Sequence, residues 1–124
     1  MLVYAFSDDP RAEAAQALLA LGCDTGLQCL NEFANVARRK LRLTWPEIAS
    51  GLADIRSLCS KVLPLEIATH AHALELATRY NLSIHDALVV SAALRGGCRL
   101  LWSEDVQDGL LVEEQLRIVN PFKQ

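Results

Sequence analysis

The sequence predicts an α/β fold, mostly helix by residue count, with a parallel sheet. Short apolar segments of strand length alternate along the chain with segments of ten or more residues whose apolar positions have helical spacing. Crossover helices of that length join parallel strands and cover both faces of their sheet. The 124 residues show no linker and no internal repeat, and this length suits one hydrophobic core. We therefore expect a single domain over residues 1–124.

The elements of the first half follow from local signals. Asp8-Asp9 ahead of Pro10, with glycine past the far end, predicts a helix over about residues 10–21. A strand end fits in residues 23–28, and apolar steps of three and four predict a helix from Leu30 to Leu41. Thr44-Trp45-Pro46-Glu47 has the pattern of a capping box, which opens a helix that runs through Ile55.

The second half alternates in the same way. Residues 61–65 read as a short strand and residues 67–80 as a helix. Another helix begins at Ser83 and stops at Gly96-Gly97. Two further strands are expected, at residues 98–102 and 116–119. Helices of ten or more residues separate the first three expected strands from one another, as parallel strands require.

Composition limits the function classes. With 52% hydrophobic residues and a formal net charge of −3, the chain is compact and does not bind nucleic acid by bulk charge. This balance neither requires nor excludes RNA. No apolar stretch approaches the roughly 20 residues of a spanning helix, and no signal peptide opens the chain, so we expect a cytoplasmic protein. The four cysteines lack metal-ligand spacing and are expected to be reduced thiols.

Three carboxylates stand where chemistry collects in α/β sheets. Asp105 follows the expected strand at 98–102, Asp86 lies in the first turn of a helix, and Glu32 lies near the start of another. In open α/β sheets, ligands bind outside the carboxyl ends of the strands. Three carboxylates that meet there would repel one another unless a cation compensates. Mg²⁺ or Mn²⁺, which prefer oxygen ligands, suit such a site.

At this point a family resemblance becomes specific. Four stretches carry it: Leu30-Asn31-Glu32-Phe33, Ser83-Ile84-His85-Asp86-Ala87-Leu88, Leu101-Trp102-Ser103-Glu104-Asp105-Val106-Gln107-Asp108-Gly109 and Asn120-Pro121-Phe122. Together they span nearly the whole chain and resemble the PIN-domain nucleases, most closely the VapC-type toxins of bacterial toxin–antitoxin pairs. The family order is an aspartate after the first strand, a glutamate on a helix, an aspartate at a later helix start and an aspartate after a later strand.

The resemblance implies a function and a site. It implies a three-layer α/β/α domain that cleaves single-stranded RNA with Mg²⁺ or Mn²⁺ and a water nucleophile. It also implies an antitoxin partner and a homodimer. Glu32, Asp86 and Asp105 are the carried-over catalytic and metal-binding residues. Asp108 matches a position that is acidic in only some members and is a further candidate metal ligand, and Ser103 matches a small hydroxyl residue of the family.

The chain departs from the family at its start. Family members have an apolar strand and then Asp-Thr-Asn or Asp-Ser-Asn ahead of a stretch like Leu2–Ser7. Neither has a counterpart here, and Asp8 and Asp9 are better placed to cap the next helix. We therefore expect an N-terminally truncated PIN-like domain that lacks one strand and one acidic residue. The alternative function is a catalytically impaired module that binds RNA or an antitoxin without cleavage.

Each single residue also has a structural interpretation. Asp86 stands three positions after Ser83, so it could serve only as a helix cap. Glu32 alone is typical of a solvated helix surface. The basic run at 38–42 fits a phosphate track, although a solvated helix end with cations near the helix dipole fits slightly better. The two tryptophans, Trp45 and Trp102, are expected in a core or an interface.

Overall fold

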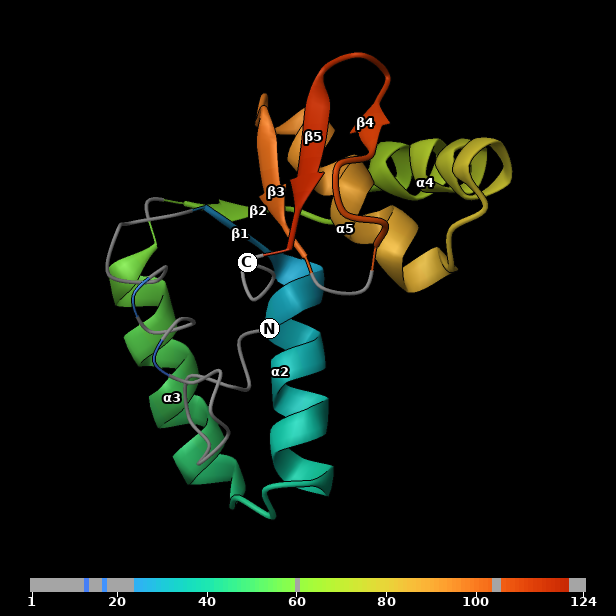
Figure 1. The fold of residues 1–124 in the computed structure, drawn as a ribbon. Coiled ribbons are helices and arrows are strands. Elements are labelled where there is room, and N and C mark those ends of the chain that lie inside the picture. Colours follow the sequence, from blue (N-terminus) through green and yellow to red (C-terminus); the bar gives the residue numbers. More distant parts are fainter. Residues whose placement is uncertain (1–12, 14–16, 18–23, 60, 104–105, 121–124) are drawn as a thin grey trace. The chain divides into compact units, whose positions relative to one another are not determined.

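The structure is a computed structural model that describes residues 13, 17, 24–59, 61–103 and 106–120. The chain divides into two compact units, Met1–Val62 and Leu63–Gln124. Figure 1 labels the helices and strands of both units. One domain over residues 1–124 stays a prediction, because two compact units can belong to one domain. Over the described residues, no helix is both long and apolar enough to cross a membrane.

The first segment of the chain is described at only two positions. Of the helix expected over residues 10–21, Glu13 and Ala17 are described, and both are helical. The stretch at 2–7 and the proposed capping aspartates, Asp8 and Asp9, lie outside the described residues.

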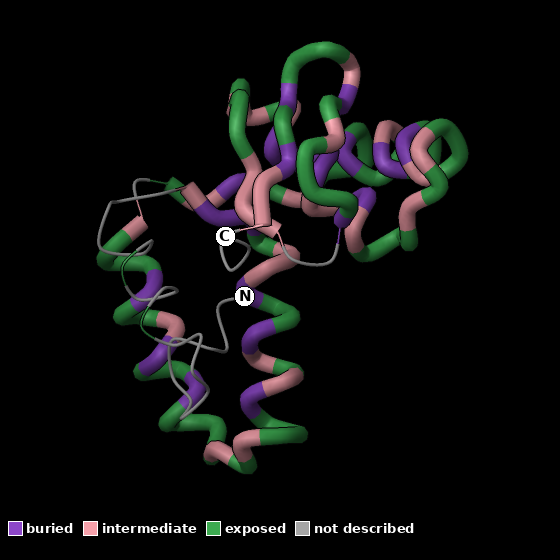
Figure 2. The backbone as a smooth tube through the Cα atoms, in the orientation of Figure 1, coloured by how far each residue is buried: buried purple, intermediate pink, exposed green. Residues whose placement is uncertain are grey.

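The first unit contains two helices in contact. β1 (Thr25–Gly26) leads into α2 (Leu27–Arg39), which contacts α3 (Trp45–Leu58). The Thr25 N–H donates to the Lys61 carbonyl at 3.2 Å, just before β2 (Val62–Leu63). The buried residues of the two helices recur at steps of three and four: Leu30, Phe33, Ala37, Ile48, Gly51 and Ile55. The predicted apolar stripe of α2 is therefore confirmed, and Figure 2 shows the buried positions on both helices.

A capping box starts α3, as the sequence predicted. The Glu47 N–H donates to Thr44 Oγ1 at 3.2 Å, and the Thr44 N–H donates to Glu47 Oε1 at 3.0 Å. The backbone hydrogen bond from Thr44 is the main reason that the pKa of the Glu47 carboxyl is lowered. The two bonds satisfy amides that a helix start would otherwise leave to water.

Replacing the cap should weaken α3. Thr44→Ala is expected to lower the free energy of unfolding by about 1 kcal/mol, measured by urea denaturation, because one helix amide loses its side-chain acceptor. Ser57→Ala is the matched control, since the Ser57 hydroxyl donates to the Asp54 carbonyl within the same helix and caps no amide. Equal losses in both variants would contradict a specific role for the cap.

The second unit begins with two packed helices. α4 (Ile67–Tyr80) contacts α5 (Ile84–Arg95). The predicted bounds of α4 are confirmed at both ends. Asn81, with φ 55°, ends α4 in the left-handed conformation, and Ser83 caps α5. Past α5, Gly97 has φ 76°, a conformation that glycine adopts without a steric penalty.

Three strands follow in the order β3-β5-β4. β3 (Leu100–Trp102) pairs in parallel with β5 (Leu116–Val119), so that Leu101 lies opposite Ile118. The α/β class and the parallel pairing are thus as predicted. β4 (Leu111–Val112) was not predicted, and it pairs antiparallel with β5.

The core of the second unit forms between its helices and β5. Leu116 and Ile118 alternate along β5 with exposed and half-buried neighbours, and both are fully buried. Their cluster also takes residues from α4, α5, β4 and the loop after β3: Ala73, Leu76, Ala87, Val90, Ala93, Val106 and Val112. Small residues on α5 let the neighbouring elements approach closely. Figure 2 shows the buried positions along α5 and β5.

Candidate functional site

Asp86 lies in the first turn of α5, and its backbone serves the cap while its side chain does not. The Asp86 N–H donates to Ser83 Oγ at 3.1 Å. No reciprocal bond completes a capping box, and among the described residues none donates a hydrogen bond to the Asp86 carboxylate. The residue is half-buried, and its carboxylate sits where the helix dipole favours negative charge. It is therefore placed to accept an external cation or donor.

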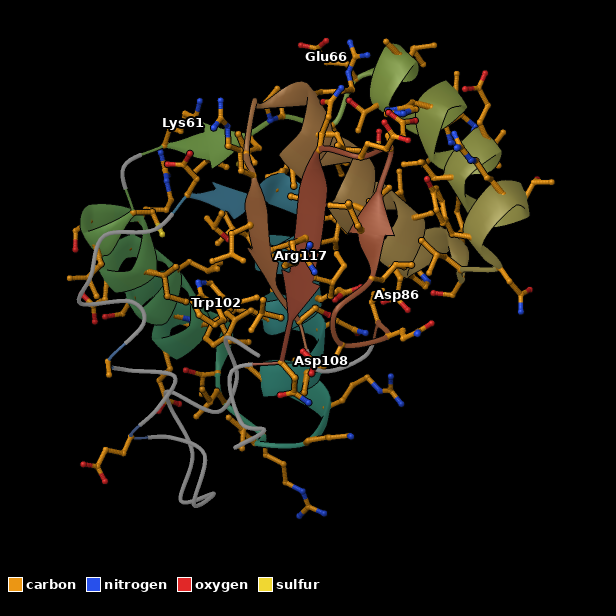
Figure 3. All side chains as sticks on the ribbon, turned by 45° about the horizontal axis from the view of Figure 1, so that its top comes forward. Lys61, Glu66, Asp86, Trp102, Asp108 and Arg117 are labelled. Atoms are coloured by element: carbon orange, nitrogen blue, oxygen red, sulfur yellow. The ribbon has the colours of Figure 1, made fainter. Side chains whose placement is uncertain are left out.

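The topology sets the position of Asp86 relative to the strands. α5 runs directly into β3, so the start of α5 lies toward the end at which β3 finishes. β5 is parallel to β3 and finishes at the same end. Figure 3 shows Asp86 and Asp108 toward this end of the second unit. That is the edge at which ligands bind in open α/β sheets.

Asp108 lies at the same edge but is engaged by the backbone. The N–H of Asn120, directly after β5, donates to Asp108 Oδ1 at 2.8 Å. The next residue, Gly109, has φ 85°, and its N–H donates to the Ile118 carbonyl at 2.8 Å. Arg117 Nη1 donates to the Gly109 carbonyl at 3.3 Å. Asp108 therefore ties the loop after β3 to the end of β5, a role that the sequence did not predict.

Two more candidate residues, Ser103 and Asp105, follow β3 in the sequence. The Ser103 N–H donates to the Val119 carbonyl at 3.0 Å, which continues the β3–β5 ladder by one bond. Asp105 lies outside the described residues, as does its neighbour Glu104.

Glu32 belongs to the first unit. It is exposed on α2, one turn after Cys29. Burial is the main cause that raises the pKa of the Cys29 thiol, a hydrogen bond from the Gly26 backbone lowers it, and the charge of Glu32 raises it. The thiol thus stays protonated and unreactive at neutral pH. Cys29, Cys59 and Cys98 are all partly buried, and their reduced state stays a prediction.

The predicted acidic site is thus described in parts. The second unit brings Asp86 and Asp108 to one edge, whereas Glu32 is described within the first unit. Among the described residues, no three His, Cys, Asp or Glu side chains form a group that could hold a metal ion. The assignment of Glu32, Asp86 and Asp105 as metal ligands stays a prediction.

A polar cluster that the sequence did not predict joins α4, α5 and the turn after β4. His72 Nε2 lies 2.9 Å from Glu113 Oε1, and His72 Nδ1 lies 3.1 Å from Ser91 Oγ. The Ser91 hydroxyl donates to the Thr69 carbonyl at 2.9 Å, and the Glu113 N–H donates to the Tyr80 hydroxyl at 2.8 Å. Ser91 is fully buried, so no substrate reaches it. The order Ser-His-Glu resembles a hydrolytic triad, yet its role here is structural.

The His72 ring contacts groups on both sides of this cluster. The Ser91 hydroxyl, which donates to the Thr69 carbonyl, lies beside His72 Nδ1 and joins the ring to α5. The contact between His72 Nε2 and Glu113 Oε1 joins the ring to the turn after β4. The Glu113 carboxylate, on the turn after β4, is therefore linked through the His72 ring to α4 and to Ser91 of α5.

Removing the centre of this cluster should destabilise the second unit. Ser91→Ala is expected to lower the free energy of unfolding by about 1–3 kcal/mol, because it leaves a half-buried imidazole nitrogen without its partner. Thermal unfolding followed by circular dichroism measures the loss. Thr78→Ala, which removes an exposed hydroxyl that donates to the Leu74 carbonyl of α4, is the control and should change stability by less than about 0.5 kcal/mol. A loss no larger than the control's would show that the cluster contributes nothing.

Comparison with known proteins gives one family. The PIN domain family matches residues 1–107, a range that includes Glu32, Asp86 and Asp105 and ends just before Asp108. No curated protein matches the chain well enough to count as a relative. PIN domains are generally nucleases, which are hydrolases, and they generally use divalent metal ions. Since the match covers most of the 124 residues, the chain belongs to the PIN domain family.

Proposed function

We propose that this PIN domain is a metal-dependent endoribonuclease that hydrolyses phosphodiester bonds in single-stranded RNA. The family match over residues 1–107 carries the proposal, because it includes three acidic residues in the order that nuclease members have. The position of Asp86 supports it. Asp86 is half-buried at the edge where β3 and β5 finish, and its carboxylate accepts no hydrogen bond from the described residues.

The proposed ligands are Glu32, Asp86 and Asp105, and the described part of this set fits a hard cation. The Asp86 carboxylate offers oxygen atoms only, which Mg²⁺ and Mn²⁺ prefer. Asp108 fits less well as a ligand, because its Oδ1 already accepts the Asn120 N–H. We assign Asp108 to positioning the loop after β3. A bound divalent ion would supply water activation and neutralise charge on the phosphodiester.

The proposal extends to the partners of VapC-type toxins. It assigns the chain an antitoxin protein as its inhibitor and a second copy of itself as its partner in a homodimer. Expression of the chain should then arrest the growth of a bacterial host, and the Asp86→Asn variant should not. Arrest by both proteins to the same extent would contradict a toxin that acts by RNA cleavage.

Cleavage of a labelled RNA tests the proposal directly. A 5′-labelled single-stranded RNA is incubated with the protein in Mn²⁺, in Mg²⁺ and in EDTA, with duplex RNA and single-stranded DNA in parallel. We expect cuts in single-stranded RNA that require the metal. A second version carries an added apolar strand ending in Asp-Thr-Asn ahead of Leu2–Ser7. It tests whether the first aspartate of the family order raises the rate of RNA cleavage.

The outcomes separate the two interpretations of the family resemblance. Metal-dependent cleavage by either folded version supports the nuclease. If both versions are folded by circular dichroism and neither cuts RNA, the nuclease proposal fails. RNA binding without cleavage would then support the alternative of a catalytically impaired binding module.

A further inference from the structure

The turn that joins α2 to α3, residues 38–45, concentrates positive charge on an acidic protein. We name it the α2–α3 tip. Arg38, Arg39, Lys40 and Arg42 are all exposed there, while the whole chain has a formal net charge of −3. One or two cations suffice to complement the partial negative charge at a helix end. Arg42 lies past the end of α2, with φ 57°, so the helix dipole does not account for it.

An exposed tryptophan adjoins these cations. Trp45, the first residue of α3, is 58% exposed, so it does not lie in the core, and the interface that the sequence also predicted for it stays a prediction. The guanidinium carbon of Arg38 lies 4.9 Å from the centroid of the Trp45 ring. Arg38 lies over the ring, yet more than half of the residue's surface stays exposed, so part of the ring remains accessible. The ring is therefore open to a second flat group.

The tip is held in one conformation by its own hydrogen bonds. Arg38 Nη1 donates to the Leu43 carbonyl at 3.1 Å, which fixes the guanidinium over the ring. The Leu43 N–H donates to the Ala37 carbonyl at 3.2 Å. The nearest carboxylate in the sequence, Glu47, accepts the Thr44 N–H and so serves the cap of α3. The arginine and lysine side chains of the tip are thus attached to a preorganised turn, which reduces the entropy lost on binding.

Cations beside an open aromatic ring are the features that bind single-stranded nucleic acid. Unpaired bases stack on aromatic rings, arginine adds cation–π attraction, and basic side chains follow the phosphates. A duplex offers no unpaired base to such a ring. An acidic protein segment would use the cations but would leave the exposed ring unexplained. The chemistry of the tip therefore favours a single-stranded polynucleotide.

We propose that the α2–α3 tip is a docking platform for single-stranded RNA. One base stacks on the open side of Trp45, and the adjoining phosphates contact Arg39, Lys40 and Arg42. The choice of RNA rests on the proposed nuclease function, whereas the stacking and the phosphate contacts rest on the tip itself. The platform holds substrate through residues that include none of the candidate acids.

Binding measured in EDTA tests the platform separately from cleavage. The probe is a fluorescein-labelled 12-nucleotide single-stranded RNA, followed by anisotropy, with single-stranded DNA and duplex RNA of the same sequence beside it. Trp45→Ala is expected to raise the Kd for single-stranded RNA about tenfold or more, the effect typical of losing one stacked base. Duplex RNA should bind more weakly, with a Kd that this change does not alter.

Neutralising the cations of the α2–α3 tip should change the salt dependence of RNA binding. The triple variant R39Q/K40Q/R42N should lower the slope of log Kd against log salt by about 2, because each phosphate contact to a single strand contributes about 0.7. The matched control, R56Q/R79Q/R95Q, removes three exposed cations from other helix positions. It should leave the slope nearly unchanged.

A fluorescence measurement locates the contact. In Trp102→Phe, Trp45 is the one remaining tryptophan of the two in the chain. Stacking of a base should quench its emission as single-stranded RNA is added. Unchanged emission at saturating RNA would show that the base lies elsewhere and would overturn the stacking proposal.

The remaining outcomes distinguish the docking platform from the proposed nuclease function. Equal Kd values for Trp45→Ala, the triple variant and the unchanged chain overturn the platform, as does an equal loss in the control. Tight binding of a polyglutamate peptide at the tip, without RNA binding, assigns it to a protein partner and also overturns it. RNA binding through the tip with no cleavage by any version supports the platform while the nuclease proposal fails. If Trp45→Ala cleaves RNA with an unchanged KM, the nuclease proposal is supported and the platform fails.

Discussion

Asp86→Asn is expected to reduce metal-dependent cleavage of single-stranded RNA by about a hundredfold or more. A metal ion contributes several kcal/mol of charge stabilisation in the transition state, and each 1.36 kcal/mol is a factor of ten in rate. An amide keeps the size of the carboxylate but removes its negative charge. Mn²⁺ binding, measured by calorimetry on the same protein, should weaken in parallel. Initial rates at saturating RNA measure the effect on catalysis.

The stability of this variant separates a functional residue from a helix cap. The cap of α5 uses the Asp86 amide and the Ser83 hydroxyl, so Asp86→Asn leaves the cap intact. Only the favourable charge at the helix start is lost, which costs about 0.5 kcal/mol. Ser83→Ala is the complementary variant and should cost about 1 kcal/mol of stability with little change in Mn²⁺ affinity.

The reverse pattern would contradict the assignment. If Asp86→Asn lost stability like Ser83→Ala and kept its Mn²⁺ affinity, Asp86 would be a structural residue. Glu75→Gln, at an exposed carboxylate on α4, controls for the loss of one negative charge and should change neither quantity.

Local signals in the sequence predicted most of the described elements. The capping box at Thr44 and Glu47 fixes the start of α3, and the observed bonds are those that the pattern implies. α4 and β5 have the predicted bounds, because their apolar periodicity and their flanking polar residues coincide. Elements such as these depend on neighbours within one or two turns of the chain.

The features that were missed depend on contacts distant in sequence or on unusual turns. β4 turns into β5 through Glu113 and Glu114, which have φ of 50° and 57°. Such turns ordinarily carry Asn-Gly or Asp-Gly, so two glutamates gave no turn signal. The bond between Glu113 and His72 spans 41 positions, and no local pattern encodes it. It also explains how this turn tolerates glutamate, since the side chain is bonded to α4.

The sequence supplied candidate residues for the site but not their geometry, and the roles of these residues stay predictions. The order Glu32, Asp86, Asp105 could be taken from the family motifs, and the family match includes all three. The structural role of Asp108 could not, because it requires the register that brings Asn120 beside the loop after β3. Of the two positions predicted for Trp45, the core is contradicted by its exposure and the interface stays a prediction. A large aromatic residue is usually buried, and only the stacking of Arg38 on its ring shows how it is accommodated at the surface.

Ile118→Ala is expected to lower the free energy of unfolding by about 2–5 kcal/mol, the range for a buried isoleucine. Ile118 is fully buried on the central strand of its sheet and belongs to the apolar cluster between β5 and the helices of the second unit. The loss combines transfer of apolar area to water with a cavity that close-packed neighbours cannot fill. Leu100→Ala, at an apolar strand residue that is 44% exposed, is the control and should cost less than half as much.

The same variant tests whether the chain is one domain, because each unit contains one of the two tryptophans. Trp45 lies in the first unit and Trp102 in the second, so Trp102→Phe and Trp45→Phe give proteins that report on one unit each. In a single cooperative domain, Ile118→Ala should lower the melting temperature reported by both tryptophans by the same amount, on the order of 10 °C. A shift in the Trp102 signal alone would mean that the units unfold independently. Equal shifts in both signals would show that the two units unfold together, as the elements of one cooperative domain do.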